Sequence, residues 1–231
     1  MFHAQILTLF PEFFDTPLAC SIPRRAIEAG IANVDCVQIR DFATDKHRRV
    51  DDSPYGGGPG MVMKPEPVVT AIRHARKQQP ETRVVLLTPS GHGFDQATAR
   101  EYAGLPGVTL VCGRYEGVDE RVTAYVDEQL SVGEFVLSGG EPAAMCVLDA
   151  VIRLLPGALG DAGSAQQDSH GEDGLLDWPH YTRPEVFEGG RVPDVLLSGN
   201  HAAIEAWRRD QARTRSEQRK KPQMRGDTER E

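Results

Sequence analysis

Three glycine-containing loops in the middle of the chain could bind a small molecule through main-chain groups. Glycine lacks a Cβ, so the N–H and C=O groups of such loops can approach a ligand closely. Each loop follows a short apolar run that is typical of a buried parallel strand. The runs and their loops are 83–88 with 89–93, 108–112 with 113–117, and 131–136 with 137–141. In an α/β sheet, ligands bind beyond the carboxyl ends of the strands, so we expect one pocket at about residues 86–142.

Asp168 and Arg153 could serve acid–base and electrostatic chemistry. Arg153 lies at the end of a predicted helix, and Asp168 follows it in the polar stretch 157–174. A carboxylate in a polar linker is usually only solvated. A general base that acts after a substrate has docked can, however, lie on a loop that becomes ordered on binding. Composition alone leaves both interpretations open.

Two basic segments could contact nucleic acid, although the formal net charge is −8. Eight Lys and Arg residues lie between Arg208 and Arg225, and a second basic group occupies 46–49. Local patches rather than the total charge decide whether a protein contacts a polyanion. The alternative interpretation of the longer segment is a solvated helix face.

Two further motifs have both a functional and a structural interpretation. The segment 177–184 (DWPHYTRP) could stack on bases and contact phosphates through Arg183, or it could be a packing corner. The glycine-rich segment 56–60 suggests a phosphate loop, but it lacks the Gly-Lys-Ser/Thr ending and could be a turn.

Apolar periodicity predicts the elements that position these residues. Besides the three runs above, strands are expected at 4–9 and 33–39, and helices at 21–29, 65–78, 95–103, 118–127, 141–155 and 200–213. Ser138 and Glu141 also fit a capping box at the start of the 141–155 helix. Alternating strands and helices favour an α/β fold. The polar stretch 157–174 predicts a domain boundary.

The cysteine pattern and the absence of a membrane-length apolar run predict a cytoplasmic protein. The four cysteines form no CxxC pair, and three lie in apolar runs, so we expect buried, reduced thiols rather than disulfides or zinc. The N-terminal residues lack the features of a signal peptide. The histidines show no ligand spacing, and we expect no structural metal.

Five motifs, in order along the chain, resemble the bacterial tRNA (guanine-N1)-methyltransferases, the TrmD family of the SPOUT superfamily. They are 45–63 (DKHRRVDDSPYGGGPGMVM), 112–121 (CGRYEGVDER), 137–141 (LSGGE), 174–184 (GLLDWPHYTRP) and 197–201 (LSGNH). The resemblance extends from about residue 1 to about residue 210.

The resemblance implies methyl transfer from S-adenosyl-L-methionine to N1 of guanine at position 37 of tRNA, with S-adenosyl-L-homocysteine as product. It implies a SPOUT-type α/β sheet with a deep trefoil knot over about residues 85–142, and a homodimer with no membrane association. A magnesium requirement is attached to the family, but no carboxylate cluster in the sequence suggests a site. The alternatives are a SPOUT methyltransferase acting on another RNA and a non-catalytic RNA-binding module.

The resemblance also gives expected domains. They are a knotted donor-binding domain (1–160), a flexible linker (161–174), a small, mostly helical C-terminal tRNA-binding domain (175–215) and a disordered tail (216–231).

Site residues are carried over by motif. Asp168 matches the general base and Arg153 the catalytic arginine. Expected donor contacts are Leu87, Pro89, Gly113, Tyr115, Glu116, Gly117, Val132, Gly133, Glu134, Phe135, Val136, Leu137, Gly139 and Gly140. Expected tRNA contacts are Lys46, His47, Arg48, His180, Arg183 and Arg208.

Overall fold

A computed structural model describes residues 1–160, 168–171 and 174–220 of the chain. The chain divides into two compact units, Met1–Ala162 and Gly163–Glu231, and each is described here by itself. None of the helices in the described ranges has the length and apolar character that crossing a bilayer requires.

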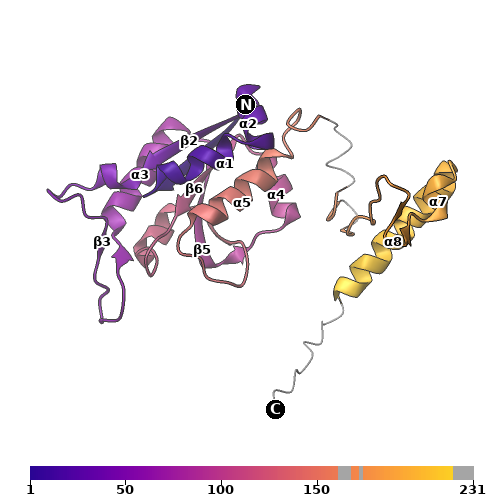
Figure 1. Cartoon of the computed structure of the whole chain (residues 1–231). Coiled ribbons are helices and arrows are strands. Elements are labelled where there is room, and N and C mark those ends of the chain that lie inside the picture. Colours follow the sequence, from indigo (N-terminus) through magenta and orange to yellow (C-terminus); the bar gives the residue numbers. More distant parts are fainter. Residues whose placement is uncertain (161–167, 172–173, 221–231) are drawn as a thin grey trace, which may run out of the picture. The chain divides into compact units, whose positions relative to one another are not determined.

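The first unit is built on a five-stranded parallel sheet, which confirms the predicted α/β class (Figure 1). All four neighbouring strand pairs are parallel, and the strand order is β2-β1-β6-β5-β7. The strands are β1 (Phe2–Thr8), β2 (Ala32–Gln38), β5 (Arg83–Gly93), β6 (Gly107–Cys112) and β7 (Glu128–Ser131). The central strand β6 is buried along its whole length, as expected of a strand covered on both faces.

Helices cover both faces of this sheet. One face packs against α2 (Ser21–Glu28), α4 (Gln96–Ala103) and α5 (Glu141–Ile152). The other packs against α3 (Pro65–Gln78) and the 3-10 helices η2 (Ile39–Phe42) and η3 (Glu120–Tyr125). On β5, Val85 and Leu87 join the first core, whereas Val84 and Leu86 join the second. This alternation gives a three-layer arrangement.

Four short elements complete the first unit. η1 (Pro11–Phe14) and α1 (Asp15–Leu18) follow β1. β3 (Asp51–Asp52) and β4 (Val62–Met63) pair antiparallel in a hairpin that extends away from the sheet in Figure 1.

The glycine-rich segment 56–60 therefore lies in a hairpin loop and does not open a helix, which favours the turn interpretation over a phosphate loop. The glycines suit this turn, because Gly56, Gly57, Gly58 and Gly60 all have positive φ.

Three local predictions are wrong. The predicted strand at 131–136 is an irregular segment, and the pairing strand lies before it, in β7. The predicted helix at 118–127 is only the six-residue η3. The capping box does not form, because Gly140 is the N-cap of α5 without a side-chain cap, and the Glu141 carboxylate turns inward.

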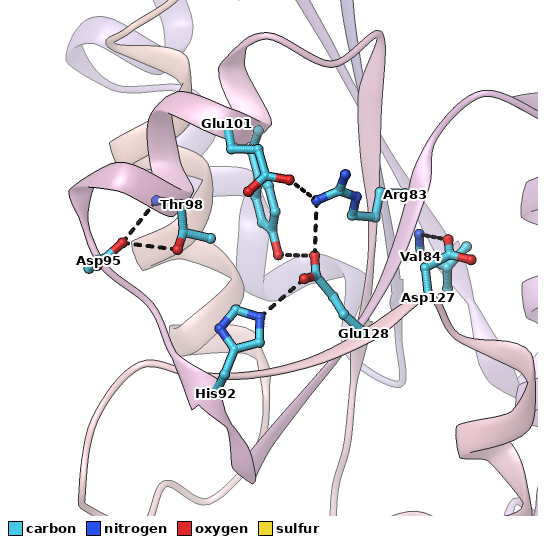
Figure 2. Close-up of polar contacts among 9 residues, drawn as sticks. Arg83, Val84, His92, Asp95, Thr98, Glu101, Asp127 and Glu128 are labelled. Atoms are coloured by element: carbon cyan, nitrogen blue, oxygen red, sulfur yellow. Dashed lines mark hydrogen bonds and ion pairs between the residues drawn. The ribbon is translucent and has the colours of Figure 1, made fainter.

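A polar network supports the edge of the sheet at β5 and β7 (Figure 2). Glu128 of β7 accepts hydrogen bonds from the Tyr102 hydroxyl and contacts His92 at 3.1 Å, and Arg83 lies 3.8 Å from it. Arg83 also pairs with Glu101 of α4. These contacts join β5, β7 and α4. Arg83 lies before an irregularity in the pairing of β5, and His92 lies after it.

The second unit combines a short hairpin with a long helix. Its elements are β8 (Val186–Phe187), β9 (Gly190–Arg191), α7 (Asp194–Leu197) and α8 (His201–Lys220). Helix α8 continues past the predicted end at residue 213, so residues 216–220 belong to it, and Ser216 is buried. Most of the predicted linker (161–167 and 172–173) and residues 221–231 of the predicted tail lie outside the described residues.

Candidate functional site

A cavity of about 380 Å³ lies at the carboxyl ends of β5, β6 and β7. Three segments form most of its wall: 86–90 from β5, 113–118 after β6, and 129–133 with 135–140 from β7 onward. The predicted convergence of the three glycine loops is confirmed. The volume falls in the range of small-molecule sites, about 300–1,000 Å³.

An irregularity in β5 shapes the first wall. The register of β5 against β7 shifts between Leu87 and His92, and the intervening Thr88, Pro89 and Ser90 line the cavity. The strand then rejoins β7 and runs to Gly93, so 89–93 is a bulge within a strand rather than a terminal loop. Gly91 is required here, because a Cβ would overlap the β7 backbone at Leu130.

The other two loops are joined to each other by main-chain contacts. The Gly140 amide donates to the Gly113 carbonyl at 2.9 Å, and Arg114 forms an isolated β-bridge with Gly139. A Cβ at Gly140 would lie 2.7 Å from Cys112 Cα. This glycine therefore permits close packing of the loops rather than only access to a ligand.

Four apolar side chains lie at the cavity mouth, together with the 113–117 loop, which carries the Glu116 carboxylate. Tyr115, Phe135, Val136 and Leu137 are all exposed and line the cavity. Glu116 lies in the 113–117 loop, and its amide donates to the Met61 carbonyl at 3.0 Å. The β3–β4 hairpin therefore contacts a wall of the cavity.

The structure brings together almost all of the predicted donor contacts. Thirteen of the fourteen residues line the cavity, and Glu134 does not. Sequence reasoning missed several polar wall residues: Thr88, Ser90, Arg114, Glu120, Thr123, Ser131 and Ser138. Ser90, Arg114 and Ser138 lie inside the predicted loops and could have been found there, whereas Glu120 and Thr123 come from η3, which was predicted as part of a longer helix.

Arg153 and Asp168 belong to different units. Arg153 is the C-cap of α5, where its amide donates to the Asp149 carbonyl at 3.3 Å, and it is not part of the cavity wall. Asp168 lies in the second unit, in the short described stretch 168–171. Next to it, the Ser169 hydroxyl donates to the Asp177 carboxylate at 3.1 Å.

The predicted tRNA contacts in the first unit lie in one exposed turn. Lys46, His47 and Arg48 are all exposed, and the Asp45 carboxylate holds the turn by accepting from the His47 and Arg49 amides at 2.9 Å. Arg48 also pairs with Asp41 at 3.3 Å.

The remaining predicted contacts lie in the second unit, where 177–184 packs against α8. The Arg208 guanidinium lies 4.8 Å from the centre of the Trp178 ring, and the Tyr181 and Trp207 rings are 6.4 Å apart. His180 contacts Asp177 at 3.2 Å, and Arg183 is exposed. The segment is therefore a packing corner with exposed polar groups, and its contact with RNA stays a prediction.

Comparisons with known proteins find one family along most of the chain. Residues 2–225 match the family model described as tRNA (Guanine-1)-methyltransferase TrmD. A tRNA (guanine-N(1)-)-methyltransferase from Geobacter sulfurreducens is 57% identical over 209 residues, covering 90% of this chain and 85% of the relative. The protein of that name from Mesorhizobium japonicum is 51% identical over 220 residues, covering 95% and 94%. A third, from Methylococcus capsulatus, is 57% identical over 210 residues, covering 90% and 83%.

Proposed function

Because the chain belongs to the TrmD family and is an S-adenosylmethionine-dependent tRNA (guanine-N1)-methyltransferase, we propose that it methylates guanine 37, beside the anticodon. The donor site is the cavity at the ends of β5, β6 and β7. The observation that carries this assignment is the meeting of three glycine-containing segments around a single cavity in the described part of the first unit. We expect the enzyme to act in the cytoplasm, where its tRNA substrates are.

The residues of the cavity fit S-adenosyl-L-methionine by size and by chemistry. Leu87, Val132 and Leu137 offer apolar surface for a purine ring, and the glycines leave main-chain groups open to polar atoms. The carboxylates of Glu116 and Glu120 favour a cationic ligand. When bound, the donor supplies an electrophilic methyl group.

Asp168 and Arg153 are proposed to perform the chemistry on guanine. N1 of guanine carries a proton and is not nucleophilic until that proton leaves. The Asp168 carboxylate accepts the proton as a positioned general base. Negative charge then develops on O6, and the permanently charged Arg153 guanidinium stabilises it.

Guanine must leave its stack to meet these groups, and six basic side chains are proposed to hold the surrounding tRNA. Unstacking costs a few kcal/mol, and less for an unpaired loop nucleotide. Lys46, His47 and Arg48 in the first unit, and His180, Arg183 and Arg208 in the second, are the proposed RNA contacts. Arg208 stacks on Trp178 and is therefore held in one orientation.

Family membership supports two further proposals, a knot and a homodimer. The family implies the SPOUT fold, and we place its trefoil knot within about residues 85–142, the stretch that forms the cavity. We also propose a homodimer, which a light-scattering mass near twice that of the chain would support. No group of three or more metal-ligating side chains occurs in the described residues, so we assign no magnesium site.

Methyl transfer to an unmodified tRNA transcript tests the proposed target. The enzyme is expected to methylate a transcript with guanine at position 37 and to leave unmodified the same transcript with another base there. Equal methylation of both would place the target elsewhere. Crystals soaked with the donor test the cavity separately, and donor bound at another position would contradict that assignment.

A further inference from the structure

A buried ion pair lies behind the cavity, between the start of α5 and the 113–117 loop. Glu141 has no exposed surface, and its Oε2 lies 2.9 Å from Arg114 Nε. Its Oε1 accepts a hydrogen bond from the Thr8 hydroxyl at 2.7 Å. A buried carboxylate is costly unless it is paired and hydrogen-bonded, so this arrangement strongly constrains both partners.

Arg114 connects this carboxylate to the 137–140 loop. Its Nη1 donates to the Ser138 carbonyl at 3.2 Å, and its guanidinium lies 4.4 Å from the centre of the Phe10 ring. Gly139 packs directly against the guanidinium, where a Cβ would overlap it. One side chain therefore contacts the segment after β1, the loop before α5 and the first residue of α5.

These contacts act on the cavity through the glycines. Gly113, Gly139 and Gly140 all line it, and the Gly140 amide already donates to the Gly113 carbonyl. The two loops are thus joined by main-chain contacts and by the Arg114 guanidinium, which donates to the Ser138 carbonyl and pairs with Glu141. Glu141 itself has no surface in the cavity, so it can influence a ligand only through its neighbours.

We propose that Arg114 and Glu141 are positioning residues for the methyl donor, and that their ion pair holds the 113–117 and 137–140 loops at the separation needed for binding. This inference rests on the proposed donor site. A different role for Arg114, as a direct ligand of the donor carboxylate, makes the opposite prediction for Glu141. Removing the Glu141 charge would then free the guanidinium and leave donor affinity unchanged or higher.

Donor binding by calorimetry to full-length Glu141→Gln, Arg114→Gln and the double variant tests the pairing. Each single variant is expected to weaken binding about 10- to 100-fold, because it leaves the other member of a buried ion pair without its partner. The double variant is expected to bind about as weakly as Arg114→Gln alone, because Arg114→Gln has already removed the contact that Glu141→Gln removes. In turnover assays, KM for the donor should rise more than kcat falls.

Conservative and control variants separate positioning from general destabilisation. Arg114→Lys keeps the charge but not the planar fork, so partial rescue is expected. If Arg114→Gln does not fold, Arg114→Lys is measured in its place. Arg24→Gln removes an exposed arginine paired with Glu28 at 3.7 Å on α2, and donor affinity should not change. A lower melting temperature with unchanged donor affinity in the Glu141 and Arg114 variants would overturn the inference. It would also be overturned if the fold-losses of donor affinity in the two single variants multiplied in the double variant.

Donor-soaked crystals distinguish this inference from the proposed function. Donor bound outside the cavity would remove the proposed site and the positioning role together. Donor bound in the cavity, with unchanged affinity in the Arg114 and Glu141 variants, would remove only the positioning role.

Discussion

Proton removal from guanine depends on one carboxylate, Asp168, in the proposed mechanism. Asp168→Ala is expected to lower the single-turnover rate of methyl transfer about 100-fold or more, the lower end for loss of a general base. Donor affinity should change little, because Asp168 is proposed to act on the guanine and not to bind the donor. Asp194→Asn, at the start of α7, is the matched control. Near-normal methyl transfer by Asp168→Ala would remove the residue from this role.

The cysteines show how far residue type alone predicts environment. Cys112 is buried as expected, but Cys20, Cys36 and Cys146 are exposed, so the expectation of buried thiols is wrong for these three. Apolar neighbours in sequence do not determine which face of an element a side chain occupies.

Thiol labelling of the native protein should follow these environments. Burial, and then the Glu141 carboxylate, raise the pKa of Cys112 well above its ordinary value. Desolvation of the thiol, with the nearby Asp15 and Asp35, raises the pKa of Cys36 to about 11, although the residue as a whole is exposed. Iodoacetamide at mildly alkaline pH should label Cys20 and Cys146 first, Cys36 more slowly and Cys112 last. Mass spectrometry checks the order, and early labelling of Cys112 would contradict the packing around Glu141.

At the scale of elements, the sequence predicted the parallel sheet and the meeting of its loops. The apolar runs of β5 and β6 and the helix Pro65–Gln78 are found where periodicity placed them. The last strand was misplaced because β7 has the partly polar sequence EQLS, whereas the apolar residues after it line the cavity mouth. Side chains that serve a ligand site do not follow the pattern of a buried strand.

The Arg114–Glu141 pair could not be predicted from the sequence. Its partners lie on different elements, and a glutamate three residues after a serine ordinarily indicates a capping box. Only the packing of α5 against the ends of β1 and β6 turns this carboxylate inward.

Helix α4 offers a test of a predicted element through its N-cap. The Asp95 carboxylate accepts hydrogen bonds from the Thr98 amide and hydroxyl, both at 2.9 Å, and these bonds lower the pKa of Asp95. Asp95→Ala should reduce the free energy of unfolding by about 1 kcal/mol at neutral pH. Asp95→Asn, which can still cap, is the control.

The pH dependence of this cap follows from the direction of the shift. Because the folded pKa lies below the ordinary value of 3.8, the ionised cap stabilises the fold above that value. The difference between the wild-type protein and Asp95→Ala should therefore shrink as the pH falls below 3.8, through the folded pKa. Urea unfolding at several pH values measures it, and a constant difference would contradict the role of the ionised carboxylate.

At the scale of the whole molecule, the proposed chemistry requires both units. The donor cavity and Arg153 belong to the first, whereas Asp168 and the long basic helix α8 belong to the second. The formal net charge of −8 conceals this division, because basic side chains are concentrated on α8. Binding of tRNA should therefore depend on local charge and on salt, as polyanion binding does.

Neutralising two exposed arginines of α8 tests this dependence. The Arg209→Gln/Arg213→Gln variant should bind tRNA more weakly, and the magnitude of the slope of log affinity against log salt should fall by up to about 1.8, since each lost phosphate contact contributes about 0.7–0.9. Donor affinity should not change. The matched control is Arg24→Gln/Arg25→Gln, which removes the same charge from exposed positions on α2. Equal effects of the two double variants would mean that total charge, rather than the surface of α8, governs the encounter with tRNA.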